Sequence, residues 1–131
     1  MKTLVDTSAW IEFFNRGEGE LAERVARLVG ADEAAITGLV RCELLAGFSS
    51  DAAFAKARGI LAAFEEVDDS SPAVRERAVE IYRSCRKRGV TVRSLVDCMI
   101  AAAALGADLP VLHRDRDFTA IAKKHPLRLA E

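Results

Sequence analysis

The chain has 131 residues, half of them hydrophobic, a length that fits one domain and leaves little room for a second. Its 19 basic and 20 acidic residues give a net charge of −1, which excludes a whole-molecule electrostatic attraction to nucleic acid. Any RNA binding therefore needs a local basic patch, or metal ions that reverse the local field.

The three cysteines form no CxxC pair, which argues against a disulfide framework or a zinc site. Cys85 and Cys98 fall in helical apolar patterns and are predicted to be buried free thiols in a reducing compartment. The N-terminus lacks the apolar region of a secretory signal, and the longest apolar run, residues 98–105, is too short to span a bilayer. We therefore expect a cytoplasmic protein without membrane contact.

Two strand–helix units open the chain. Residues 2–6 predict a short strand that ends in an acid, and Ser8 is placed to cap the helix that follows it. Apolar side chains with helical spacing predict an amphipathic helix over residues 21–29. Residues 34–37 predict a second strand, and the helix after it, residues 38–47, stops at a glycine.

The middle of the chain continues with helices. Asp51 is predicted to cap a helix that presents aromatic and aliphatic side chains on one face. Residues 64–67 predict a third strand. Ser71 followed by Pro72 is a strong helix start, and the apolar stripe after it extends that helix to about Lys87.

The last third alternates in the same way. Ser94 opens a helix that runs through the alanine-rich segment to residue 107. A strand over 109–113, a helix near 118–124 and a final strand over 127–129 complete the pattern. Strands that alternate with helices predict an α/β fold: one domain, residues 1–131, with a five-stranded parallel sheet flanked by helices on both faces.

Acidic side chains follow the ends of two predicted strands, Asp6 after the first and Asp115 after the fourth. Ligands of open parallel sheets bind beyond the carboxyl ends of the strands. Asp97, in a first helical turn, and Glu43, in the helix after the second strand, can reach the same edge. Grouped carboxylates repel one another unless a cation joins them, and oxygen ligands without a paired His or Cys favour Mg²⁺ or Mn²⁺. Such a site can activate water for attack on phosphorus.

Each acid also has a purely structural interpretation. Asp6 can cap the first helix, Glu43 can be a solvated helix charge, and Asp97 can be the capping partner of the serine three residues before it. Asp115 and Asp117 alternate with arginines and can form a charged turn.

Two further features remain open between binding and structure. A basic run, completed by Arg93, can contact RNA phosphates but more commonly complements a helix dipole; its other members are Arg83, Arg86, Lys87 and Arg88. Trp10 can stack on a base, but its helical spacing with neighbouring phenylalanines favours a place in the core or at a partner surface. No residue is assigned to RNA binding from the sequence.

The order of motifs resembles that of the PIN-domain ribonucleases, and especially the VapC-like toxins of toxin–antitoxin pairs. The matching segments are LVDTSAWIEFF, ITGLVRCELLAG, SLVDCMIAAAA and LHRDRDF, and they cover nearly the whole chain. The resemblance implies a five-stranded parallel sheet between helices, and cleavage of RNA that depends on Mg²⁺ or Mn²⁺. It also implies an acidic catalytic and metal site formed by Asp6, Glu43, Asp97 and Asp115, to which Asp117 can add a ligand and which Thr7 or Ser8 assists by hydrogen bonding.

The resemblance further implies a cognate antitoxin whose tail occupies the acidic groove, and a homodimer. Aromatic side chains in helical regions can supply an exposed apolar face for the dimer; they are Trp10, Phe13, Phe14, Phe48 and Phe54.

Three other functions fit parts of the pattern. An aspartyl-phosphate phosphohydrolase with Asp6 as nucleophile normally has an acid two residues later, where this chain has Ser8. A phosphoacceptor receiver domain needs adjacent acids after its first strand, but here Thr7 follows Asp6. An inactive PIN-like binding module is disfavoured by the full set of acids.

Overall fold

Short apolar runs form a parallel sheet at the centre of the computed structural model, which describes residues 2–15 and 17–130. The sheet has four strands in the order β3-β2-β1-β4, and every neighbouring pair is parallel. All residues of three strands are buried, as expected for a parallel sheet covered on both faces, whereas two of the three residues of the edge strand β3 are exposed. The strands are β1 (Thr3–Val5), β2 (Ala34–Thr37), β3 (Glu65–Val67) and β4 (Val111–Leu112).

The fifth predicted strand is reduced to an isolated parallel bridge between Leu129 and Val111. Val111 N donates to the carbonyl of Arg128 at 3.0 Å, and Ala130 N donates back to Val111 at 2.8 Å. Pro126 has no backbone N–H and the chain turns at this point, so pairing begins only two or three residues later. Within the described residues the sheet therefore has four strands rather than five.

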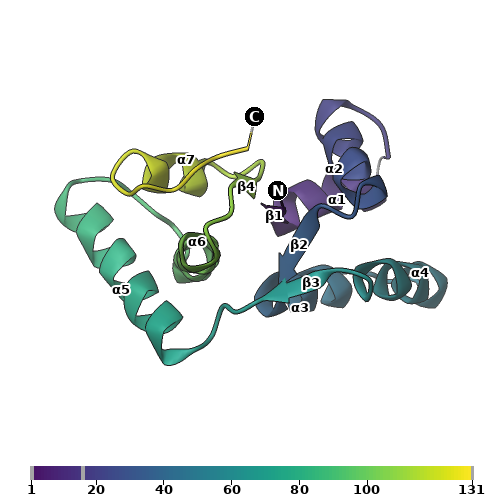
Figure 1. Cartoon of the computed structure of the whole chain (residues 1–131), viewed down its shortest axis with the longest axis horizontal. Coiled ribbons are helices and arrows are strands. Elements are labelled where there is room, and N and C mark those ends of the chain that lie inside the picture. Colours follow the sequence, from purple (N-terminus) through teal and green to yellow (C-terminus); the bar gives the residue numbers. More distant parts are fainter. Residues whose placement is uncertain (1, 16, 131) are drawn as a thin grey trace.

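Seven helices surround the sheet in the described part of the chain, with α5 and α6 on one side of it and α1 and α2 on the other (Figure 1). This arrangement confirms the predicted α/β class with helices on both faces. The helices are α1 (Thr7–Asn15), α2 (Glu20–Gly30), α3 (Gly38–Ala46), α4 (Asp51–Leu61), α5 (Pro72–Lys87), α6 (Leu95–Ala107) and α7 (Arg116–Ala122).

Two of the predicted helix caps are displaced. The α1 helix begins at Thr7, and its cap is the carboxylate of Asp6, which accepts a hydrogen bond from Ser8 N at 3.1 Å. The α4 helix is capped by Ser50, which accepts from Ala53 N, and not by Asp51. In both cases a polar side chain earlier in the chain accepts from the first turn, so the helix starts earlier than predicted.

The caps predicted for the later helices are confirmed. Ser71 Oγ accepts from Val74 N ahead of Pro72 at the start of α5, and Ser94 Oγ accepts from Val96 N at the start of α6. The small side chains of residues 101–104 are all buried, which lets α6 pack closely under the sheet and against α5.

The structure shows whether several apolar residues lie in the core or closer to the surface. Trp10 is fully buried and packs against the rings of Phe14 and Phe64, so it is a core residue, and its proposed part in an exposed apolar face is wrong. The other aromatic residues proposed for that face are half-buried. Cys85 and Cys98 are buried free thiols, as predicted, and burial raises the pKa of Cys98 to about 12.

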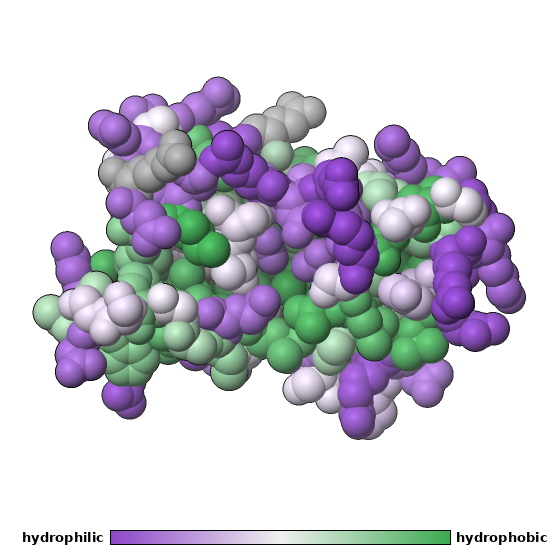
Figure 2. Space-filling view, turned by 180° about the vertical axis from the view of Figure 1, so that it is seen from behind, coloured by the Kyte–Doolittle hydropathy of each residue, from purple (hydrophilic) through white to green (hydrophobic). Residues whose placement is uncertain are grey.

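The surface is uneven in polarity. Viewed from behind, hydrophobic side chains reach the surface mainly along the lower part of the molecule, while the upper part is mostly hydrophilic (Figure 2). Across residues 2–15 and 17–130, no helix is both long and apolar enough to cross a membrane.

Candidate active site

The sheet brings the ends of β1 and β4 together. These strands are parallel neighbours, with Val5 opposite Leu112, so the residues that follow them lie at the same edge. Asp6 directly follows β1, and its backbone N–H donates to the carbonyl of Leu112 at 3.0 Å. Asp115 follows β4 and caps α7 by accepting from Asp117 N at 2.9 Å.

The acids of α6 and α7 are the most tightly grouped. Carboxylate oxygens of Asp97, Asp115 and Asp117 all lie within 4.8 Å of one another. Asp117 is almost fully buried, and its carboxyl is hydrogen-bonded to that of Asp97. Burial, that hydrogen bond and the charges of Asp115, Asp6 and Asp117 raise the pKa of Asp97 to about 8. In the absence of a cation, the group therefore retains a proton near neutral pH.

Asp6 joins this group through its charge, since it repels the ionised form of Asp97. Its side chain is buried and accepts from both the backbone N–H and the hydroxyl of Ser8, the latter at 2.7 Å. Burial raises the pKa of Asp6 in spite of these hydrogen bonds, and the charge of Asp115 adds to the effect. Asp6 is thus both a helix cap and a carboxylate that ionises unfavourably.

Ser8 and Thr7 connect the acids to their surroundings. The Ser8 hydroxyl accepts from the backbone N–H of Arg114 at 2.8 Å, which ties the end of β1 to the loop after β4. The Thr7 hydroxyl donates to Glu43 at 3.1 Å. Glu43 is exposed on α3 and is not a member of the tight group; this contact with Thr7 is what links it to the residue after Asp6.

Arg93 is the cation of the site, a role that the sequence did not identify. It lies in the turn just before α6, and its backbone N–H donates to Asp117 at 3.0 Å. Its guanidinium contacts Asp117 through Nε and Asp115 through a terminal nitrogen, both at 3.4 Å. The usable sequence signal was its place directly before the cap of the helix that carries Asp97.

A second set of acids, after β3, also escaped the sequence analysis. Asp69 is buried and accepts from Leu39 N at 2.7 Å, so it adds a second acceptor to the start of α3, whose N-cap is Thr37. Glu66 pairs with Arg41 at 3.1 Å. The sequence signal is the pair of aspartates, Asp68 and Asp69, that directly follows a strand, as Asp6 does.

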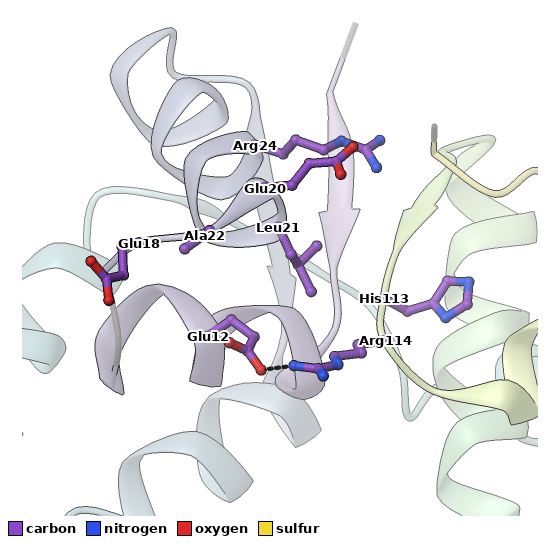
Figure 3. A pocket seen from close by; sticks show the side chains of 9 residues that line it. Glu12, Glu18, Glu20, Leu21, Ala22, Arg24, His113 and Arg114 are labelled. Atoms are coloured by element: carbon purple, nitrogen blue, oxygen red, sulfur yellow. Dashed lines mark hydrogen bonds and ion pairs between the residues drawn. The ribbon is translucent and has the colours of Figure 1, made fainter.

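One hollow in the described surface lies beside the acids, not over them. It has a volume of about 460 Å³, and Arg114 reaches across its floor to an ion pair with Glu12 (Figure 3). None of the predicted site acids lines it, but two lining residues connect it to the acidic group: Arg114 N donates to Ser8 Oγ, and His113 Nδ1 accepts from Asp115 N. The lining residues are Glu12, Glu18, Gly19, Glu20, Leu21, Ala22, Arg24, His113 and Arg114.

Comparisons with a family model and with individual proteins agree on one protein family. Residues 3–124 match the family model described as PIN domain. Ribonuclease VapC11 of Mycobacterium tuberculosis is 34% identical over 130 residues, which cover 97% of this chain and 96% of that protein, and VapC ribonuclease Mb1587 of Mycobacterium bovis has the same identity and coverage.

Solved structures share the fold at lower identity. VapBC2 from Rickettsia felis, bound to a promoter DNA fragment, has a TM-score of 0.80 at 17% identity and covers 99% of this chain and 98% of its own. A toxin–antitoxin complex from Klebsiella pneumoniae has a TM-score of 0.72 at 22% identity, over 98% of this chain and 100% of that one.

Proposed function

The chain belongs to the PIN-domain family, and from that premise we propose that it is a metal-dependent endoribonuclease, the toxin of a toxin–antitoxin pair. The observation that carries the proposal is the group of carboxylates at the carboxyl edge of the sheet, where Asp97 ionises only at about pH 8. The ribonuclease part of the proposal rests on the named relatives, which are 34% identical to this chain over nearly their whole length.

The donor set fits a hard divalent cation. Its ligands are carboxylate oxygens, with no cysteine or histidine in the group, and this composition favours Mg²⁺ or Mn²⁺. We assign Asp6, Glu43, Asp97 and Asp115 to the catalytic metal site, with Asp117 as a further ligand or support. A divalent ion bound by these oxygens supplies positive charge to the scissile phosphate and lowers the pKa of a water molecule.

The surrounding residues hold the acids in position. Ser8 fixes the carboxylate of Asp6 by two hydrogen bonds, and Thr7 donates a hydrogen bond to Glu43. The backbone N–H of Asp115 donates to His113 Nδ1 at 3.1 Å, and its carboxylate caps α7. These contacts arrange the acids before substrate arrives, which reduces the cost of ordering them during the reaction.

The partners follow from the same premise. An antitoxin segment that places an arginine near Asp6 and Asp97 would neutralise the site and block RNA. A homodimer would use the apolar surface in the lower part of Figure 2. The proposed ribonuclease domain comprises residues 1–131 and acts in the cytoplasm, where reducing conditions suit its buried free thiols.

The phosphohydrolase alternative finds no support at its key position. That chemistry needs a proton donor two residues after Asp6, and Ser8 there already donates its hydroxyl hydrogen to Asp6 and accepts from Arg114 N.

The proposal is tested with the purified chain and a mixed RNA substrate in Mg²⁺, in Mn²⁺ and in chelator. We expect cleavage with either ion and none in chelator, and a loss of more than about 100-fold in Asp97→Asn with either ion. Cleavage that continues unchanged in chelator, or in the variant, would overturn the metal-dependent function.

A further inference from the structure

A single arginine contacts two of the acids that the proposed function assigns to metal. Arg93 approaches Asp117 through its backbone N–H and Nε, and Asp115 through one terminal nitrogen. Within residues 2–15 and 17–130, no salt bridge reaches Asp6 or Asp97. Arg93 is therefore the positive charge that offsets this acidic group in the described structure.

The two contacts of Arg93 differ in strength. The contact with Asp117 has two points, one of them a 3.0 Å hydrogen bond from the backbone, and the Asp117 side chain is only 2% exposed. The contact with Asp115 is one ion pair at 3.4 Å, with side chains that are 54% and 26% exposed. Exposed ion pairs contribute little and are readily exchanged. Asp115 can therefore leave Arg93 while Asp117 stays attached.

Asp115 is also the acid that can serve two cations. Its Oδ1 accepts from Asp117 N and from Arg93, which leaves Oδ2 with no hydrogen bond that the described residues supply. A carboxylate oxygen of Asp115 lies within 4.8 Å of one from Asp97. A divalent ion between Asp97 and Asp115 would thus sit close to the guanidinium, and two cations at one carboxylate repel each other.

The geometry points to Arg93 as a built-in counter-cation that competes with divalent metal for Asp115 while holding Asp117 in place. This inference rests on the proposed function, because it takes the acids as metal ligands. Arg93 offsets the repulsion among the acids when metal is absent, and its guanidinium withdraws from Asp115 when metal binds. The wild-type protein therefore binds metal more weakly than its carboxylates alone would allow.

A simple structural brace makes the opposite prediction. If Arg93 only positioned the acids, its removal would let Asp115 and Asp117 move apart and would weaken metal binding. The sign of the change in metal affinity therefore separates competition from bracing, without any measurement of RNA cleavage.

The test is isothermal titration of the full chain with Mn²⁺, comparing wild type with Arg93→Gln. We expect the variant to bind Mn²⁺ about tenfold more tightly, a coupling of ordinary size between two sites. Arg93→Met keeps the apolar stem without the charge and gives the same expectation, so the result does not depend on one variant folding. Arg88→Gln is the matched control: Arg88 is an exposed cation of the same segment that contacts the carbonyl of Lys124, and its change leaves affinity within about twofold.

Equal or weaker Mn²⁺ binding by the folded Arg93 variants overturns the competition and leaves the proposed function intact. An absence of Mn²⁺ binding by the wild type and by all variants overturns the metal-dependent function, and the inference with it.

Discussion

Two groups of acids lie at the same edge of the sheet, and they are held in opposite ways. The central group combines Asp6 after β1 and Asp115 after β4 with Asp97 from α6; the outer group follows β3 and includes Asp68 and Asp69. In the outer group, Asp68 accepts from the backbone N–H groups of Ser70 and Ser71, and hydrogen bonding from these serines lowers its pKa.

For Asp6 and Asp97 in the central group, burial is the dominant influence on the pKa. Burial raises the pKa of Asp6 in spite of its bonds to Ser8, and burial with three neighbouring carboxylates raises that of Asp97 to about 8. The comparison teaches that a strand-end acid alone does not mark a site. The distinguishing property is a carboxylate whose ionisation the fold opposes and which a bound cation would relieve.

Substitutions in the two groups of acids should differ most in their effect on RNA cleavage. Asp97→Asn removes a proposed metal ligand from the central group, and we expect cleavage to fall by more than about 100-fold, beyond the usual cost of losing an outer metal partner. Asp68→Asn, which keeps the turn on an exposed outer residue, should leave the rate within about twofold. Initial rates on one RNA at saturating Mn²⁺ measure both, and comparable losses would remove the distinction between the groups.

In chelator, the effect on stability should be the reverse of the effect on cleavage: a substitution in the outer group should destabilise the protein, and one in the central group should not. Asp69→Ala leaves the N-cap Thr37 of α3 in place but removes the acceptor of Leu39 N, so we expect the free energy of unfolding to fall by about 1–2 kcal/mol. Asp97→Asn relieves like-charge repulsion and should leave the metal-free protein equally or more stable. Urea unfolding followed by circular dichroism checks both; a clear loss of stability in Asp97→Asn would show that Asp97 is chiefly structural.

The two groups of acids should also differ in how their contribution to folding stability depends on pH. In chelator the folded protein keeps a proton on Asp97 that the unfolded chain releases above its ordinary pKa of 3.8. The contribution of this protonated carboxyl to the stability of the folded state is fully present below about pH 4 and is lost as the pH rises to 8. Asp68 has a lowered pKa, so its contribution is present above its unfolded pKa and is lost as the pH falls through its folded pKa.

Urea unfolding at pH 5, 6.5 and 8 tests this expectation. The stability difference between wild type and Asp97→Asn should move in favour of the variant as the pH rises. A difference that stays constant from pH 5 to 8 would contradict the protonated state of the central group.

The sequence predicted those features that depend on local pattern. Alternating apolar runs placed β1, β2 and β3, and Ser71 and Ser94 marked helix starts, because caps and periodicity act within a few residues. The final strand was overestimated, since its short apolar run follows Pro126, which delays pairing until Leu129.

The sequence could not predict contacts between distant segments. Arg93 meets Asp115 and Asp117 across 22 and 24 residues, and Asp69 meets Leu39 across 30. Such pairs arise from the sheet order, which brings the loop after β4 against the turn before α6. The same limit explains why strand-end placement singled out Asp6 but could not show that Asp69, similarly placed, accepts from Leu39 N.

The most direct test of the central claim is the change in melting temperature that Mn²⁺ produces in wild type and in Asp6→Asn. Asparagine keeps the shape of Asp6 and can still cap α1, so the substitution separates the metal ligand from the cap. We predict that saturating Mn²⁺ raises the melting temperature of the wild type by about 5 °C or more, and that most of this gain is lost in the variant. An Asp6→Asn protein with the full Mn²⁺ gain would contradict the claim that the central acids form a metal site.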